Sequence, residues 1–378
     1  MAAFLTGGCS EGEPFGHPSA EREKRVEVSF RLEAVGTDVS LVPMTRATSY
    51  TQWFRNTARL LILKKADTRW IVDTTQTVLL DAQSGPWAEL KIAGDLPPCP
   101  FNLELRPGDY RIVAGINWGS ADWNNDLVPG KVVSDETDGS LRTPPLLTYT
   151  ISTHWMNNGY RQLSREVFVA VADFPVPKSG DLHSAGVPPV TLRAERRVAK
   201  FRVLLKDKPS PVNGFSFDMT AHTVQMLLTS KTEPFAEGID ALGGMYYGDP
   251  ALYELPCCMS TMGDFHSSGT ERYQMCQTNS TVFSPFVFAD PASELPIGIL
   301  DIDISGASGG YTYKTDQTFA RTLAASKISG IVFETTDTYD DSSSQIRIDV
   351  VEATDDAGNP ENAAALFDSF FEWNASPY

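Results

Sequence analysis

The stretch VEVSFRLEAV, Val26–Val35, decides the fold class of this 378-residue chain. Because successive side chains of a strand point to opposite faces, a period of two gathers apolar groups on one face. This stretch is therefore predicted to be a half-buried strand with one dry face and one wet face. The apolar members of the alternation are Val26, Val28, Phe30, Leu32 and Ala34, and the polar members between them are Glu27, Ser29, Arg31 and Glu33.

Strand patterns of this kind continue along most of the chain, and Gly, Pro, Asn and Asp turns separate them. There is no sustained alternation of strands with helices and no internal repeat of fixed period. The predicted class is therefore all-β, with two β-sandwiches in tandem and few short helices. Further strands are predicted at residues 58–65, 77–80, 110–117, 165–174, 281–288, 297–305, 328–334 and 344–351.

Two segments have helical spacing instead. In DQTFARTLAASK, residues 316–327, Phe319 and Leu323 are one helical turn apart. In NPENAAALFDSFFEW, residues 359–373, Pro360 stands at the position that begins a helix. Both segments are predicted to be helices.

A proline-rich loop, PVPKSGDLHSAGVPP at 175–189, interrupts the strand pattern. Proline lacks the donor that a central strand needs, so a domain boundary is predicted here. The pattern resumes after it, with Ala199, Phe201, Val203 and Leu205 predicted to point inward. The predicted organisation is a lipoprotein-like leader and linker (1–25), an N-terminal sandwich (26–185) and a C-terminal sandwich (190–378).

Composition excludes several classes of function. The chain is 42% hydrophobic and 21% charged, which is typical of a folded soluble protein. Its formal net charge is −17, and such a surface repels phosphate backbones, so no nucleic-acid partner is expected. No apolar run approaches the roughly 20 residues that a membrane helix needs.

The first of the five cysteines is distinctive by its position. In MAAFLTGGCSEGEP, Cys9 follows a short apolar stretch that ends in small residues. The segment resembles the end of a bacterial lipoprotein signal, in which the cysteine is lipidated, although Leu5 stands one residue further from Cys9 than usual. Glu11 and Glu13 resemble the acidic export tag of surface lipoproteins. The alternative is an unstructured N-terminal extension.

The remaining cysteines allow a disulfide. Cys257 and Cys258 are adjacent and cannot easily bond each other, so a bridge from one of them to Cys276 is predicted. A zinc site that adds His266 lacks any C-x-x-C spacing and is disfavoured. Neither a metal nor a cofactor is expected.

No catalytic motif stands out. Asp301 and Asp303 share a strand face and could form a carboxylate pair of glycosidase type, but a solvated face is the favoured interpretation. Asp337, Asp340 and Asp341 could hold calcium, but a solvated hairpin tip is favoured there. The chain is not expected to be an enzyme.

Aromatic residues form the better candidate site. Trp118 and Trp123 lie in a loop rich in Gly, Ser, Asp and Asn, and Trp155 and Tyr160 repeat the pattern in STHWMNNGY. Aromatic rings with amide and carboxylate neighbours are typical of sugar-binding faces. The alternative, which is favoured, is that each tryptophan packs over the end of a sandwich.

Three short motifs resemble the fimbrillin-type (type V pilus) surface lipoproteins of Bacteroides and Porphyromonas. LRPGDYRIVAGINW at 105–118 resembles the pGxYxxvaxxN strand of their first domain. LRAERRVAKFRVLL at 192–205 resembles the strand that opens their second domain, with an Arg-x-x-Ala-Lys pattern. MTRATSY at 44–50 resembles the Thr-Arg-Ala segment at which such subunits are cut, here after Arg46.

This resemblance implies two transthyretin-like β-sandwiches, a lipid anchor in the outer membrane and a location at the cell surface or in a fimbrium. It also implies partners that are other fimbrial subunits joined by strand exchange, and contact with a host protein or glycan. The predicted C-terminal helix departs from a donor strand, so a minor tip or anchor subunit is favoured. The alternative is a glycan-binding surface lipoprotein that does not polymerise.

Lipidation of Cys9 is directly testable. We expect the full-length product to sediment with membranes and the Cys9→Ala variant to appear in the soluble fraction, because a lipid chain provides the membrane affinity. Fractionation of cells that express each form is the measurement. Equal release of both forms into the soluble fraction would contradict lipidation.

Overall fold

The computed structural model describes the parts of the chain from which the fold is built. These are residues 25–35, 57–79, 99–116, 123–152, 160–162, 167–178, 188–207, 222–268, 271–277, 286–306, 312–315, 319–325, 327–340 and 345–361.

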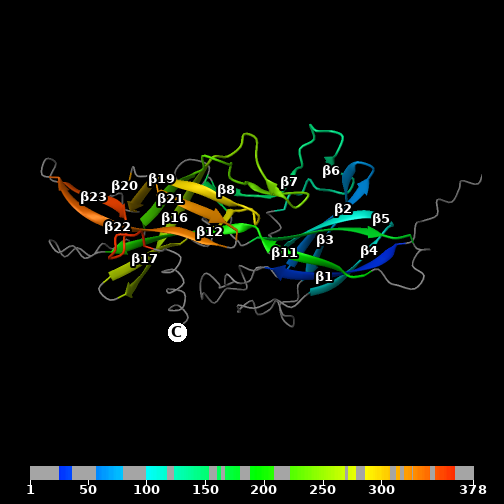
Figure 1. Ribbon diagram of the computed structural model, residues 1–378, viewed down its shortest axis with the longest axis horizontal. Coiled ribbons are helices and arrows are strands. Elements are labelled where there is room, and N and C mark those ends of the chain that lie inside the picture. The colour runs from blue at the N-terminus through cyan, green and yellow to red at the C-terminus, as the bar shows by residue number, and fades with distance from the viewer. Residues whose placement is uncertain are drawn as a thin grey trace, which may run out of the picture.

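The described residues form strands in four sheets and contain no helix, which confirms the all-β prediction. Two large sheets lie one after the other along the long axis of the molecule, and short strands lie between them (Figure 1). Among the described residues there is no helix that is long and apolar enough to cross a membrane.

The first large sheet has eight strands and includes most of the predicted N-terminal half. The predicted strand at residues 26–35 is found with the same bounds. In spatial order the strands are β4 (Cys99–Leu105), β1 (Val26–Val35), β11 (Val190–Arg196), β10 (Phe168–Val176), β5 (Gly108–Ile116), β2 (Thr57–Ala66), β3 (Arg69–Leu79) and β6 (Val132–Asp135).

One face of this sheet carries a hydrophobic core. Side chains on one face of β1, β2, β4, β5, β10 and β11 belong to a single buried cluster. The ring of Phe30 stacks on Phe101 with 5.1 Å between centroids and meets Phe174 edge-on at 5.2 Å. The alternating apolar side chains of β1 therefore lie on one buried face, as predicted.

The second large sheet has ten strands from the C-terminal half. Its main path is β20 (Thr312–Thr315), β19 (Glu294–Gly306), β13 (His222–Thr229), β16 (Glu254–Ser268), β17 (Glu271–Gln277), β12 (Val198–Asp207), β22 (Ile328–Asp340) and β23 (Gln345–Glu352), while β18 (Phe286–Phe288) pairs with β12 and β21 (Phe319–Ala324) pairs with β19.

The predicted helix at 316–327 is wrong. Its described part is strand β21, which pairs antiparallel with β19 from Ile299↔Phe319 to Glu294↔Ala324. Phe319 and Leu323 are both buried, as expected of two positions on one face. A spacing of four residues fits a strand as well as a helix, because four is a multiple of the strand period. Pairing with β19 decided between the two.

The second predicted helix, 359–373, falls mostly outside the described residues. At its start, Pro360 forms an isolated β-bridge with Thr354, and the Asp355 carboxylate accepts a hydrogen bond from the Asn359 N–H at 2.8 Å. Pro360 therefore belongs to a turn and does not begin a helix at this position.

The chain crosses from one sheet to the other at Arg197. The strand β11 pairs with β1 and β10 in the first sheet, whereas β12 begins one residue later in the second. The Arg197 N–H donates to the Val167 carbonyl at 2.9 Å, and its carbonyl accepts from the Ala289 N–H at 3.0 Å. The crossing lies one strand beyond the predicted loop boundary, so the division into domains at 185–190 stays a prediction.

A second connection joins the halves. The strand β7 (Pro145–Thr148) pairs with β14 (Gly238–Asp240), and β15 (Met245–Tyr246) completes a three-stranded sheet. Close by, the Tyr149 hydroxyl accepts a hydrogen bond from the buried Phe288 N–H at 2.8 Å. One buried cluster includes side chains of both halves, so the junction is a hydrophobic core.

The remaining two-stranded sheet consists of β8 (Thr150–Ser152) and β9 (Tyr160–Gln162).

The junction requires a glycine at position 238. A Cβ there would lie 1.9 Å from the carbonyl oxygen of Leu147 in β7, which is too close for any side chain. We expect Gly238→Ala to lower the free energy of unfolding by about 1–3 kcal/mol through overpacking. Urea unfolding is the measurement, and Gly139→Ala is the matched control because a Cβ at that position meets nothing within 4 Å. Equal stability of both variants would contradict this close approach.

Candidate functional site

The strand β1 occupies an interior position in the first sheet, and we call this position the β1 slot. On one side β1 pairs antiparallel with β4, from Val26↔Leu105 to Leu32↔Cys99. On the other side it pairs parallel with β11, from Phe30↔Val190 to Val35↔Glu195. The first described strand of the chain therefore bridges two strands that have no ladder of their own between them.

The β1 slot is apolar on its inner side. Val28 and Leu32 are fully buried and Phe30 is 1% exposed, and they pack among Leu103 and Leu192 of the neighbouring strands. Burial of each such side chain contributes about 1.5–3 kcal/mol. Several of these side chains act together along β1, so an empty slot would be strongly unfavourable in water.

The predicted processing residues lie outside the described part of the chain. Arg46 follows β1 in the sequence, beyond its last residue Val35, and Cys9 precedes it. Cleavage after Arg46 and lipidation of Cys9 therefore stay predictions.

Of the predicted aromatic contacts, Trp123 is buried. It is 5% exposed and belongs to the core at the junction, and the guanidinium carbon of Arg59 lies 4.9 Å from the centroid of its ring. This agrees with the core-packing alternative for Trp123. Trp118 and Trp155 lie outside the described residues, and for Tyr160 the structure describes the backbone of β9 alone.

The backbone register bears on the predicted disulfide. Cys276 in β17 is the partner of Thr261 in β16, while Cys258 is the partner of Gln225 in β13. Cys258 is three residues from Thr261, which is about 10 Å along a strand, and a disulfide needs Cα atoms within about 7 Å. A bridge from Cys257 or Cys258 to Cys276 stays a prediction and requires a shift from this register.

Asp301 and Asp303 lie on a strand, β19, as predicted, whereas Asp337 and Asp340 lie within a strand and not at the tip of a hairpin. Asp303 in β19 pairs with Gln225 of β13 and with Lys314 of β20. Asp337 and Asp340 belong to β22, which pairs antiparallel with β23, and Asp341 lies outside the described residues. In the described ranges, no group of His, Cys, Asp and Glu could hold a metal ion.

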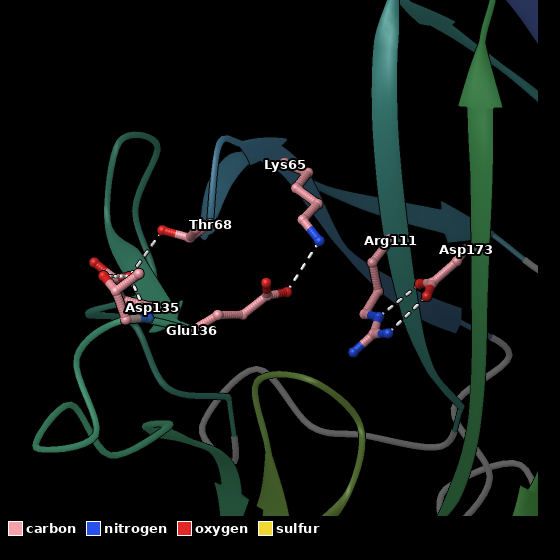
Figure 2. Close-up of polar contacts among 7 residues, drawn as sticks. Lys65, Thr68, Arg111, Asp135, Glu136 and Asp173 are labelled. Atoms are coloured by element: carbon pink, nitrogen blue, oxygen red, sulfur yellow. Dashed lines mark hydrogen bonds and ion pairs between the residues drawn. The ribbon is translucent and has the colours of Figure 1, made fainter.

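A polar cluster on the first sheet had no signal in the sequence. Its centre is Trp70, which is 8% exposed. The Lys65 ammonium and the Arg111 guanidinium lie 5.6 Å and 5.0 Å from the centroid of the Trp70 ring. The same Arg111 donates two hydrogen bonds of 2.6 Å to the Asp173 carboxylate on β10 (Figure 2). Cation–π contacts and a bidentate pair thus join strands β2, β3, β5 and β10.

Asp135 ends the cluster at the edge strand β6. Its carboxylate accepts a hydrogen bond from the Thr68 hydroxyl at 3.0 Å (Figure 2). It also accepts hydrogen bonds from the Thr137 N–H and hydroxyl and from Arg69 Nε at 2.7 Å. These bonds, with the Thr137 N–H first, lower the pKa of Asp135 well below its ordinary value. Its neighbour Glu136 pairs with Lys65 at 2.9 Å. The edge is thereby held by charge-assisted contacts.

Asp240 approaches this cluster from the C-terminal half. Its carboxylate accepts hydrogen bonds from the Leu242 and Gly244 N–H groups at 2.8 and 2.9 Å. Burial raises the pKa of Asp240, although those hydrogen bonds and the nearby Arg111 charge oppose the shift. The turn that follows packs Gly243 against Val171 of the first sheet. The cluster therefore stabilises the junction of the halves, and no catalytic geometry is evident in it.

No protein-family model matches the chain, and no curated protein matches it. Several solved structures are similar. A candidate polysaccharide-binding protein of Bacteroides thetaiotaomicron has a TM-score of 0.44 at 10% identity and covers 88% of this chain and 100% of its own. The fimbrial anchor protein Mfa2 of Porphyromonas gingivalis has a TM-score of 0.39 at 10% identity, with 87% and 97% covered. A candidate adhesin of Bacteroides ovatus has a TM-score of 0.41 at 10% identity, with 86% and 93% covered.

These neighbours are fimbrial or candidate adhesin and polysaccharide-binding proteins of Bacteroides and Porphyromonas, the bacteria whose surface lipoproteins the sequence motifs resemble. At such identities and TM-scores the likeness itself assigns no function. The proposal that follows therefore rests on the sequence and geometry of this chain.

The raised pKa of Asp240 predicts a pH-dependent effect. At pH 7 the buried carboxylate is ionised and disfavours folding, and protonation as the pH falls through its raised folded pKa removes that penalty. The amide oxygen of Asp240→Asn still accepts both backbone hydrogen bonds. We therefore expect this variant to be more stable than the parent at pH 7, by a difference that shrinks toward pH 4.

Urea unfolding at both pH values is the measurement, and Asp356→Asn, at an exposed turn position, is the control. A stability difference that is the same at pH 7 and pH 4 would show that burial of Asp240 does not penalise its charge.

Proposed function

We propose that this chain is a fimbrial subunit of a bacterial surface, a minor tip or anchor component, and that in a tip position it accepts a strand of another subunit in the β1 slot. The observation that carries the proposal is the position of β1. It is the first described strand, it fills an interior apolar slot, and it precedes Arg46 in the sequence. The motif resemblance to fimbrillin-type lipoproteins supports the same role.

The slot has the physical properties that strand exchange needs. Removal of β1 would leave the facing backbone groups of β4 and β11 without their ladder partners, together with the apolar side chains behind them. A strand from another subunit with the same alternation would satisfy both. Val26, Val28, Phe30 and Leu32 define what such a strand must supply, namely apolar side chains at every second position.

The position of Cys9 supports a minor position in the fimbrium. Cys9 precedes β1, so a lipidated chain that stays uncut keeps both its membrane anchor and its own strand in the slot. Such a chain could offer other surfaces to a subunit but would not accept a strand in this slot. An anchor subunit therefore functions without cleavage after Arg46, whereas a tip or stalk subunit needs cleavage to open the β1 slot.

The burial of Trp123 removes one of the aromatic residues on which the alternative role of a non-polymerising glycan-binding lipoprotein depends. The proposed function is structural and adhesive, and not enzymatic.

Limited cleavage with a trypsin-like protease tests the β1 slot. We expect cleavage after Arg46 to convert a stable monomer into a form that binds a synthetic peptide of residues 26–35, and we expect Arg46→Ala to prevent the conversion. Within the peptide, Phe30→Ala should weaken binding by about 3–5 kcal/mol, since a buried phenylalanine is lost. Arg31→Ala is the matched control, because Arg31 is exposed on the opposite face of β1.

Size-exclusion chromatography with a labelled peptide is the measurement. A cleaved protein that releases its own strand and yet ignores both the peptide and its partner subunits would refute strand exchange. If Arg46 resists cleavage while assembly proceeds, the slot is not used and an anchor role alone remains.

A further inference from the structure

A buried ion pair holds the end of the described chain against the C-terminal sheet. The Lys206 ammonium on β12 donates a hydrogen bond to the Glu361 carboxylate, and the two residues are 155 positions apart in the sequence. Their side chains are only 4% and 11% exposed. Lysine is among the residues that are almost never fully buried, so this amine calls for a specific explanation.

An apolar patch lies next to the lysine. Because side chains alternate along a strand, Lys206 shares one face of β12 with Leu204, and Val203 of the junction core points to the other face. In the parallel ladder with β22, Leu204 is the partner of Val332, and Lys206 is the partner of Glu334. Leu204 and Val332 are fully buried, although neither belongs to the junction core. The patch is therefore a separate buried environment.

The segment after β23 brings Glu361 to this patch. The Ala353 N–H donates to the Val332 carbonyl at 2.8 Å, and the Glu361 N–H donates to the Ala353 carbonyl at 2.9 Å. Ala353 is itself fully buried. Two backbone hydrogen bonds thus fix the position from which Glu361 reaches Lys206.

A second carboxylate, that of Glu334, belongs to the same patch. Neighbouring strands are about 5 Å apart, and ladder partners project to the same face of a sheet, so Glu334 lies beside Lys206. The Oε2 atom of Glu334 is fully buried. The patch therefore holds one amine and two carboxyl groups away from water. An ion pair needs only one carboxylate, and the second is a group that can transfer protons.

We propose that Lys206 and Glu361 condense to an amide cross-link, with Glu334 as the proton-transfer group. A proton first passes from the Lys206 ammonium to the Glu361 carboxylate along the hydrogen bond that joins them. The products are a neutral amine and a carboxylic acid. An apolar environment penalises charge, so burial brings this neutral pair closer in free energy to the ion pair than it is in water.

The bond-forming step is balanced without a further reactant. The lone pair of Lys206 Nζ attacks Cδ of the Glu361 carboxylic acid and forms a C–N bond. The Glu334 carboxylate accepts the proton that the nitrogen gives up and delivers it to the hydroxyl of the acid. The C–O bond then breaks and one water molecule leaves, so nothing is oxidised or reduced. The fold supplies the proximity that such a condensation needs.

The cross-link would change how the C-terminal half bears force. It would join β12 to the segment after β23 and enclose the strands between them. Tension between the two ends of the chain would then pass through the amide and bypass those strands. This protection suits the adhesive role proposed above, although the chemistry does not depend on that role.

Mass spectrometry of the purified, folded chain tests the cross-link. We expect an intact mass that is one water molecule below the sequence mass, and a branched tryptic peptide that contains both Lys206 and Glu361. Lys206→Arg and Glu361→Ala should each restore the full mass. Glu334→Gln keeps the size of the side chain but accepts a proton poorly, so it should slow formation of the link after refolding about 100-fold.

The pair of Lys327 and Glu294 is the matched control. Its Nζ and Oε1 atoms are 2.7 Å apart, but its side chains are 65% and 60% exposed. Lys327→Arg should therefore leave both the loss of water and the branched peptide unchanged. Far-ultraviolet circular dichroism of each variant shows whether a lost link reflects a lost fold.

Recovery of Lys206 and Glu361 in separate, unmodified peptides from the folded parent chain would overturn the proposal, and this outcome needs no variant. A loss of water that maps to other residues would overturn it as well. A link that forms as fast in Glu334→Gln as in the parent would refute the proton-transfer role of Glu334.

Discussion

The burial of the apolar face of β1 is the interaction on which the first half of the molecule depends. Phe30 stacks on Phe101 and meets Phe174 edge-on, so a single side chain of β1 connects the β4 side of the sheet with the β10 side. The backbone of β1 also supplies the ladder between β4 and β11. Both roles belong to the first described strand. A cut in the connection between β1 and β2 would therefore separate the strand that completes the sandwich from the remainder of the chain.

The second constraint is the shared core at the junction. Leu61, Leu63 and Val113 lie on the face of the first sheet opposite to the β1 slot, and they pack in one cluster with Phe201 and Phe288 of the second half. The central strands β2 and β5 are therefore buried on both faces. Loss of β1 would open one face of this sheet while the junction still held the other, which is how an opened subunit could stay folded long enough to accept a strand.

The charged groups around Trp70 in the first sheet satisfy one another. Around Trp70, each charge has an opposite charge or a ring beside it, and Arg111 and Asp173 satisfy each other in a bidentate pair. Such a cluster is internally complete and stabilises structure.

The sequence by itself determined the strand β1, its inward face and the all-β class, because a period of two needs no information from distant residues. It also predicted the inward positions Ala199, Phe201 and Val203, which are buried. It could not separate strand from helix at Phe319 and Leu323, since their spacing fits both periods. The burial of Trp123, the polar cluster around Trp70 and the pairing of Lys206 with Glu361 were decided by tertiary structure alone. Each depends on which distant strands come together, and that choice is made by the packing of the whole core and not by any local pattern.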